Sequence, residues 1–152
     1  QSRGNIASLN SRTGSLKPFN HSFNGYISSL LVDGDWLYIG GNFTQIIWNN
    51  QSHGAQRFAR INIKTNEVQN AFMNGPVRTI QRFGPYIFAG GDFTGVNSQT
   101  HKYLAAFNPA SFAVTWSGDG DGIVETLMTD GNTLYAGGTF HSIALQNRNY
   151  IL

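Results

Sequence analysis

Trp36-Leu-Tyr-Ile-Gly-Gly-Asn-Phe-Thr44 occurs twice more along the chain, as Tyr86-Ile-Phe-Ala-Gly-Gly-Asp-Phe-Thr94 and as Thr133-Leu-Tyr-Ala-Gly-Gly-Thr-Phe-His141. The glycine pairs begin at residues 40, 90 and 137, so their spacings are 50 (90 − 40) and 47 (137 − 90) residues. A period of this size is typical of architectures that repeat one supersecondary unit. The chain is therefore interpreted as a repeat protein.

The agreement between the copies continues on both sides of the motif. Glycine stands fifteen residues before each glycine pair, a β-branched residue thirteen before, and phenylalanine three after. These positions are Gly25, Gly75 and Gly122; Ile27, Val77 and Val124; and Phe43, Phe93 and Phe140. A second block recurs as Ala7-Ser-Leu-Asn10, Ala59-Arg-Ile-Asn62 and Ala105-Ala-Phe-Asn108.

Each period predicts four short strands, which in the first full copy cover 26–32, 36–43, 57–63 and 67–72. Asp33-Gly34 and its repeat Asp130-Gly131 are hairpin signals, because such turns need positive φ; Gly84-Pro85 takes the same place. The second strand is apolar on both faces, so we expect its sheet to be covered on both sides. Its glycine pair is expected to allow a bulge or a close backbone approach.

A turn with a left-handed residue is predicted after the second block. Gly14 and Asn66 stand at the left-handed position, and both residue types tolerate positive φ. Phe112 stands there in the third copy. Because a bulky side chain opposes positive φ, we expect no left-handed turn in that copy.

Four strands per period of about 40–50 residues, with both sheet faces buried, are typical of β-propeller blades. A β-sandwich is the alternative, but its strands normally keep one polar face. We predict an all-β propeller segment of antiparallel four-stranded blades over residues 1–152. Its parts are half a blade at 1–20, whole blades at 26–72 and 77–116, and half a blade at 123–152.

The two ends of the chain are in the same phase, since residues 1–7 align with 146–152 at a shift of 145. The chain thus holds about three blades, whereas a closed ring normally needs about four or more. One chain is not expected to close the ring. Either the sequence is a piece of a longer propeller protein, or identical copies associate, two of them giving six blades.

Composition excludes several classes of protein. Charged residues make up 12% and aromatic residues 13%, unlike a disordered chain. No apolar run approaches the roughly 18 residues of a membrane span, and the basic residues form no block that would indicate a nucleic-acid surface. The absence of cysteine excludes disulfides, thiolate metal sites and a cysteine nucleophile.

The pattern Leu-Tyr-x-Gly-Gly-x-Phe-Thr, followed by Ala-x-Φ-Asn (Φ apolar) and Thr-Gly, resembles the Kelch-like propeller repeats of secreted and cell-surface proteins. It is similar to the Gly-Gly-x-Phe-Thr repeats of bacterial surface proteins and of the fungal cortical cell-polarity marker. The resemblance covers nearly the whole chain and implies a propeller with roles in surface display and recognition. One departure is His141, which stands where the other copies have threonine.

No arrangement of residues indicates an enzyme. The four histidines, at 21, 53, 101 and 141, form no His-x3-His metal pair. His53 and His101 fall in corresponding loops, where they are candidates for partner or glycan binding. A Kelch-like oxidase is the least favoured interpretation, because it needs metal ligands clustered on such loops.

Ser117-Gly-Asp-Gly-Asp-Gly122 resembles half of a calcium loop, in which carboxylate oxygens suit Ca²⁺. Asp119 and Asp121 are the candidate ligands. A turn without metal is the competing interpretation, because the spacing to Glu125 does not fit an EF-hand.

Three segments fit the N-glycosylation pattern: Asn20-His-Ser22, Asn42-Phe-Thr44 and Asn50-Gln-Ser52. Asn20, Asn42 and Asn50 are therefore predicted to carry glycans if the protein passes through a eukaryotic secretory route.

Trp48 lies in an insertion that only the first copy has. We predict a long polar loop over 48–54, in which Trp48, Asn49, Gln51 and His53 contact a partner or a sugar. Local packing of the tryptophan is the alternative.

These features predict a non-catalytic structural or recognition module of a secreted or cell-surface protein. Its rigid blades would present edges and loops to protein neighbours, among them blades of a longer chain or of identical copies. A lectin-like propeller that binds carbohydrate is the alternative. No cofactor is expected apart from the calcium considered above, and neither nucleic acid nor membrane insertion is expected.

Overall fold

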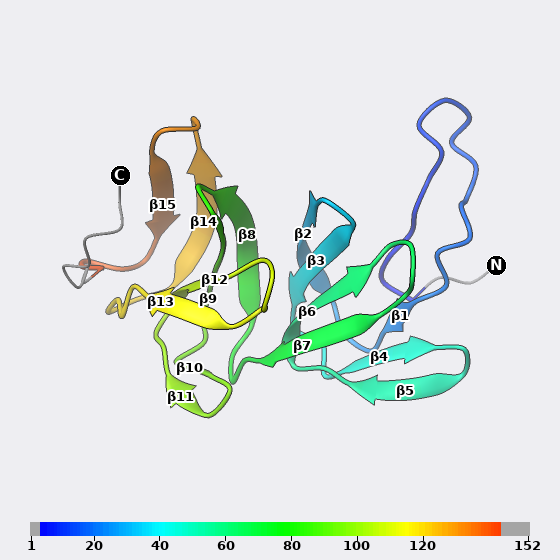
Figure 1. Ribbon diagram of the computed structural model, residues 1–152. Helices are drawn as coiled ribbons and strands as arrows, with labels where there is room; N and C mark the ends of the chain where they lie inside the picture. Colours follow the sequence, from blue (N-terminus) through cyan, green and yellow to red (C-terminus); the bar gives the residue numbers. More distant parts are fainter. Residues whose placement is uncertain (1–3, 144–152) are drawn as a thin grey trace.

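The computed structural model describes residues 4–143, and within them the chain is entirely β (Figure 1). None of these residues forms a helix that could cross a membrane. The strands are β1 (Ser22–Phe23), β2 (Ile27–Asp33), β3 (Trp36–Gly41), β4 (Gln45–Trp48), β5 (Gln51–Gly54), β6 (Arg57–Asn62), β7 (Val68–Phe72), β8 (Val77–Phe83), β9 (Tyr86–Gly91), β10 (Gly95–Val96), β11 (Gln99–Thr100), β12 (Leu104–Phe107), β13 (Val114–Ser117), β14 (Val124–Thr129) and β15 (Leu134–Gly138).

Two sheets have four antiparallel strands, in the orders β2-β3-β6-β7 and β8-β9-β12-β13. β14 and β15 pair as a two-stranded sheet, and the short strands form the sheets β1-β4-β5 and β10-β11. The prediction of an all-β chain with antiparallel sheets is confirmed. Among the described residues these sheets form neither a closed barrel nor a closed ring (Figure 1).

Tight turns join the first two strands of each repeat. Gly34, Gly84 and Gly131 adopt φ values of 59°, 53° and 98° there. A residue with a β-carbon is strained in this region, which explains why all three copies carry glycine at this place. The predicted hairpins are therefore present in all three copies.

A β-bulge faces each glycine pair. Ile27 pairs with Gly41 and Ser29 with Gly40, so Ser28 is the extra residue, and the same register shift occurs in the other two copies. A β-carbon on Gly41 would lie 2.1 Å from the carbonyl oxygen of Tyr26. The predicted bulge and the predicted close backbone approach are both confirmed.

Successive sheets pack face to face through one repeated contact. β8 lies against β2 and β3, and β14 lies against β8 and β9. A β-carbon on Gly40 would lie 2.6 Å from Cγ1 of Val77, and one on Gly90 would lie 2.6 Å from Cγ1 of Val124. In the first two pairs, the first glycine thus makes room for the valine of the next repeat.

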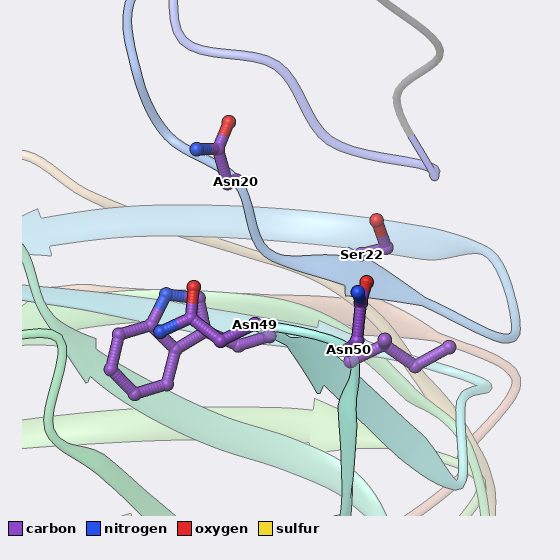
Figure 2. A pocket seen from close by; sticks show the side chains of 6 residues that line it. Asn20, Ser22, Asn49 and Asn50 are labelled. Carbon is purple, nitrogen blue, oxygen red and sulfur yellow. The ribbon is translucent and has the colours of Figure 1, made fainter.

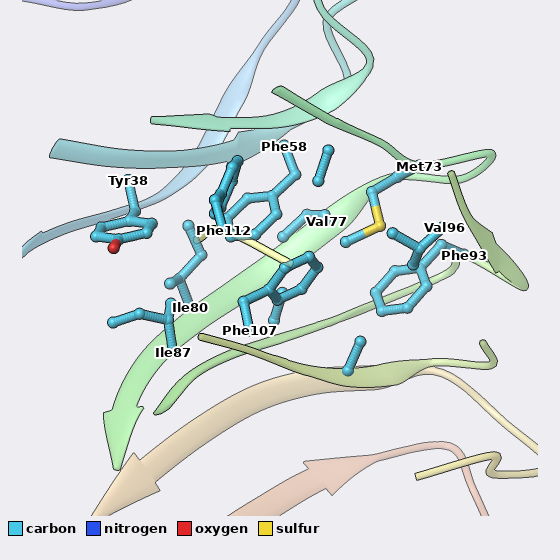
Figure 3. Close-up of a cluster of buried hydrophobic side chains, with 13 residues drawn as sticks. Tyr38, Phe58, Met73, Val77, Ile80, Ile87, Phe93, Val96, Phe107 and Phe112 are labelled. Atoms are coloured by element: carbon cyan, nitrogen blue, oxygen red, sulfur yellow. The ribbon is translucent and has the colours of Figure 1, made fainter. Parts of the chain in front are cut away.

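β3 is buried on both faces, as its apolar pattern predicted. Tyr38 and Ile39 are adjacent in the strand and both 0% exposed, yet they belong to different hydrophobic clusters. Tyr38 packs with Ile80 and Ile87 of the second sheet (Figure 3). Ile39 faces the opposite way, into a cluster that includes Ile6 from the N-terminal segment.

The prediction for Phe112 was wrong, because this residue adopts a left-handed φ of 56°. The cause is Asn108, whose side-chain oxygen accepts two backbone N–H bonds from the turn and whose carbonyl oxygen accepts the N–H of Phe112. Asn10 and Asn62 make the same bonds in their copies. Burial of the Phe112 ring against Phe107 offsets the strain in its backbone.

The N-terminal segment lies on the far side of the first sheet from the second one (Figure 1). Ile6 is buried there, and Leu9 and Leu16 form an antiparallel bridge. The predicted alignment of residues 1–7 with 146–152 falls mostly outside the described residues.

Candidate functional site

Trp48 ends β4 and belongs to a β-hairpin, so the prediction of a long loop over 48–54 was wrong. It pairs with Gln51 of β5 across a two-residue turn, in which Asn49 and Asn50 have φ values of 50° and 60°. A turn of this kind needs two left-handed residues, and asparagine accepts that conformation more readily than most residues do. The insertion is therefore an ordered arm of the first repeat.

A hollow of about 400 Å³ lies beside this hairpin, where β1 extends the sheet by pairing with β4. It is lined by Asn20, Ser22, Ile47, Trp48, Asn49 and Asn50 (Figure 2). Ser22 and Ile47 were missed from the sequence, although each is next to a buried residue, Phe23 or Ile46, and strand alternation turns it outward. Amides, a hydroxyl and an aromatic side chain together suit a polar ligand with an apolar face.

The structure brings only part of the predicted binding set to this hollow. Trp48 and Asn49 line it, and Gln51 is exposed across the hairpin. His53 is half-buried in β5, and its buried Nε2 atom has no hydrogen-bond partner among the residues that the structure describes. His101 follows β11 in the hairpin of the next repeat. Neither histidine lines the hollow.

His21 contacts Trp48, which lines the hollow, and was not predicted as a site residue. Its imidazole is 1% exposed and stacks on Trp48, with ring centroids 5.5 Å apart and an interplanar angle of 10°. Within the described part of the chain, neither ring nitrogen has a hydrogen-bond partner. Burial, with a smaller contribution from the charge of His53, lowers the pKa of His21 to about 4. The Trp48 indole thus packs on an imidazole that is neutral near pH 7.

Acid is expected to destabilise the fold through His21. Its pKa is about 4 when folded and 6.5 when unfolded, so the unfolded state binds the proton first as the pH falls. The free energy of unfolding should fall by roughly 2–3 kcal/mol between pH 6.5 and 4. Urea unfolding at both pH values measures it. His21→Phe should remove most of this loss, whereas the control His141→Gln, at an exposed histidine, should retain it; equal losses in both variants would refute the assignment.

All three predicted glycosylation sites have exposed asparagines. Asn20 and Asn50 line the same hollow. Asn42 lies in the loop after β3, and its side-chain oxygen accepts a hydrogen bond of 3.2 Å from Nε of Arg57. Whether any of them carries a glycan stays a prediction.

The aspartates predicted as calcium ligands bind backbone amides. Asp121 Oδ1 accepts the N–H groups of Ser142 and His141, at 2.9 and 2.8 Å, and these bonds lower the pKa of the carboxyl. Asp119 Oδ1 accepts the N–H of Lys102 at 3.2 Å and the hydroxyl of Ser117 at 3.1 Å. Across residues 4–143, no cluster of three or more His, Asp or Glu side chains is placed to hold a metal ion. Calcium binding here stays a prediction.

None of the known protein-family models matches this chain, and no curated protein sequence matches it significantly. The Kelch-like resemblance therefore rests on the repeat motif alone.

Proposed function

We propose that the chain is a non-catalytic recognition module made of Kelch-like propeller blades, in a secreted or cell-surface protein. It binds protein neighbours through the faces at the two ends of its stack of sheets. The extracellular assignment rests on the resemblance of the repeat and on the three glycosylation patterns.

The contacts between the sheets support the blade assignment. In both four-stranded sheets the strands lie side by side in the order of the chain, as in a propeller blade. The hairpins β4–β5 and β10–β11, inserted between the second and third strands, belong to separate sheets. Each four-stranded sheet contacts the next repeat in the same way, because a valine of the next repeat packs against a glycine of the sheet. These contacts are Val77 on Gly40 and Val124 on Gly90. A stack with one repeated contact is what neighbouring blades of a propeller require, whereas a sandwich pairs only two sheets.

One observation carries the binding function: positions that are buried inside the stack are exposed at its ends. Tyr38 is 0% exposed, but its repeat equivalent Tyr135 is 55% exposed. Ile80 is 5% exposed, but its equivalent Leu30 is 50% exposed. Uncovered apolar faces of this kind mark interaction sites on soluble proteins.

Hydroxyl-radical footprinting tests this function. Met128 and Tyr135, 69% and 55% exposed, are oxidisable residues on one end face, and the buried Met73 is the internal reference. In native protein from its own source, we expect slower oxidation of Met128 and Tyr135 than in the dilute chain of residues 1–152. Equal oxidation rates in the two samples would contradict the proposal.

The hollow at Trp48 favours carbohydrate as a second candidate function, since three amides and a hydroxyl surround its aromatic residue. On a glycan array, Trp48→Ala should lose any sugar signal, whereas the control Trp116→Phe, in β13, should keep it. Absence of signal for the unmodified chain, or a signal that survives Trp48→Ala, would remove this candidate.

A further inference from the structure

We propose that the two end faces bind each other between copies of this chain. The β14–β15 sheet of one copy docks head to tail on β2 of a second copy, and two such contacts close a dimer. This inference rests on the proposed function and names its partner. Three features of the contacts between successive sheets recur along the described part of the chain, and none of them is formed there at the outer face of the β14–β15 sheet. The residues that would complete each feature lie at the other end of the chain, in β2 and β3.

The first feature is the valine that fits against a glycine. Val77 meets Gly40 and Val124 meets Gly90, whereas among residues 4–143 a β-carbon on Gly137 would meet only Thr126 of its own sheet, at 3.0 Å. The repeat equivalent of the two valines is Ile27, at the start of β2. A second copy of the chain therefore carries the β-branched side chain that fits over Gly137.

The second feature is a hydrogen bond between neighbouring repeats. Ser29 Oγ accepts the backbone N–H of Ile80 at 3.0 Å. Thr79 Oγ1 accepts the N–H of Leu127 at 3.1 Å, in the equivalent place. In the third repeat, the residue equivalent to Ser29 and Thr79 is the exposed Thr126. The donor equivalent to Ile80 and Leu127 is then the backbone N–H of Leu30 in the second copy. Both contacts between successive sheets contain this hydrogen bond. The bond therefore defines the register in which β2 of the second copy docks on β14.

The third feature is the aromatic residue on the second strand. Tyr38 packs in one cluster with Ile80 and Ile87. At the end of the stack Tyr135 is exposed, and the residues equivalent to Ile80 and Ile87 are Leu30 and Leu37 of β2 and β3. Leu30 is half exposed. Among the described residues, no pair of strands equivalent to β2–β3 covers this face of the first sheet.

The sheet edges favour the same arrangement. β3 and β9 each pair on both edges, the second time with β6 and β12, whereas β15 pairs only with β14 among the described residues. The N-terminal block 7–10 is the repeat equivalent of the end of β6, and Ile6 beside it is already buried against the first sheet. Docked on β2, the β14–β15 sheet of one copy lies next to this block of the other and extends it toward a four-stranded sheet.

Such an interface is heterologous, since two different surfaces meet, and this permits a sharp test by sedimentation velocity on the full chain. We expect the sedimenting mass to rise from one chain toward two chains as the concentration approaches about 0.5 mM, where even a Kd of ~1 mM gives a measurable dimer fraction. Gly137→Val on one face and Leu30→Asp on the other should each give monomers. Gly54→Val is the control, because no atom of residues 4–143 lies within 4 Å of its β-carbon position. This variant should still dimerise.

Mixing the two monomeric variants distinguishes this interface from a symmetric one. One intact pair of faces remains between Gly137→Val and Leu30→Asp, so the mixture should form a 1:1 complex. Circular dichroism confirms that both variants are folded. A monomeric unmodified chain, dimerisation that persists in either variant, or a mixture that stays monomeric would overturn the inference. Footprint protection in native protein together with a monomeric purified chain would retain the proposed function and overturn only the identity of the partner.

Discussion

Gly41→Ala is expected to destabilise the fold by more than about 3 kcal/mol, a large part of the stability of a domain of this size. The added methyl group would lie 2.1 Å from the carbonyl oxygen of Tyr26 and 3.0 Å from Cα of Ile27. Both atoms belong to the backbone, so no side-chain rotation relieves the clash. The bulge opposite the glycine pair would have to open.

The matched control for this prediction is Gly54→Ala. Gly54 is also in a strand of the first repeat, but no described residue has an atom within 4 Å of its β-carbon position, and its φ is not positive. Its substitution should change the free energy of unfolding by no more than about 0.5 kcal/mol. Urea midpoints of the two variants measure the difference. Similar midpoints would show that the glycine pair does not set the packing of β2 on β3.

Arg60→Met is expected to lower the free energy of unfolding by about 3–5 kcal/mol. Arg60 is 1% exposed and joins the two four-stranded sheets. Its guanidinium donates hydrogen bonds to the carbonyl oxygens of Pro109 and Ala110 in the turn of the second sheet. It also lies 4.1 Å from the centroid of the Trp36 ring. Methionine fills the space but leaves both carbonyl groups without their donor.

Two further variants identify which property of Arg60 matters. Arg60→Lys keeps the charge but lacks the planar fork that reaches both carbonyl groups and stacks on an aromatic ring, so it should also be destabilising. Arg12→Met, at an exposed arginine, should change stability by less than about 0.5 kcal/mol. Thermal or urea unfolding checks all three. An Arg60→Met protein as stable as Arg12→Met would show that the buried guanidinium of Arg60 does not contribute to the free energy of unfolding.

The repeat made the strands predictable, because strand alternation and the Asp-Gly turns recur in phase with the glycine pairs. The bulge was predictable for the same reason, since two glycines inside an apolar strand indicate a close backbone contact. The prediction for Phe112 was wrong because it depended only on the size of the Phe112 side chain. Every copy has an asparagine four residues before this position, at Asn10, Asn62 or Asn108. Its hydrogen bonds fix the turn, so the residue at the left-handed position adopts positive φ whatever its type.

The site was less predictable, because its residues are not part of the repeat. Asn49-Asn50 between apolar and polar strand residues is a hairpin signal, which the prediction of a polar loop over 48–54 does not use. His21 and Ser22 precede the first motif, and only the pairing of β1 with β4 places them at Trp48. Arg60 stands where the other copies have Ser8 and Ala106, so the period gave no indication of a buried guanidinium.

The most direct test of the account is whether successive sheets pack through their valine and glycine residues in solution. In a carbon-edited nuclear Overhauser spectrum, we expect cross-peaks from the Cγ1 methyl of Val77 to the α-protons of Gly40, and from that of Val124 to those of Gly90. Cross-peaks between Tyr38 and Arg60, which pair within one sheet, report that the sheet is folded. Their presence together with the absence of both valine–glycine contacts would contradict the face-to-face stack and, with it, the end faces proposed for binding.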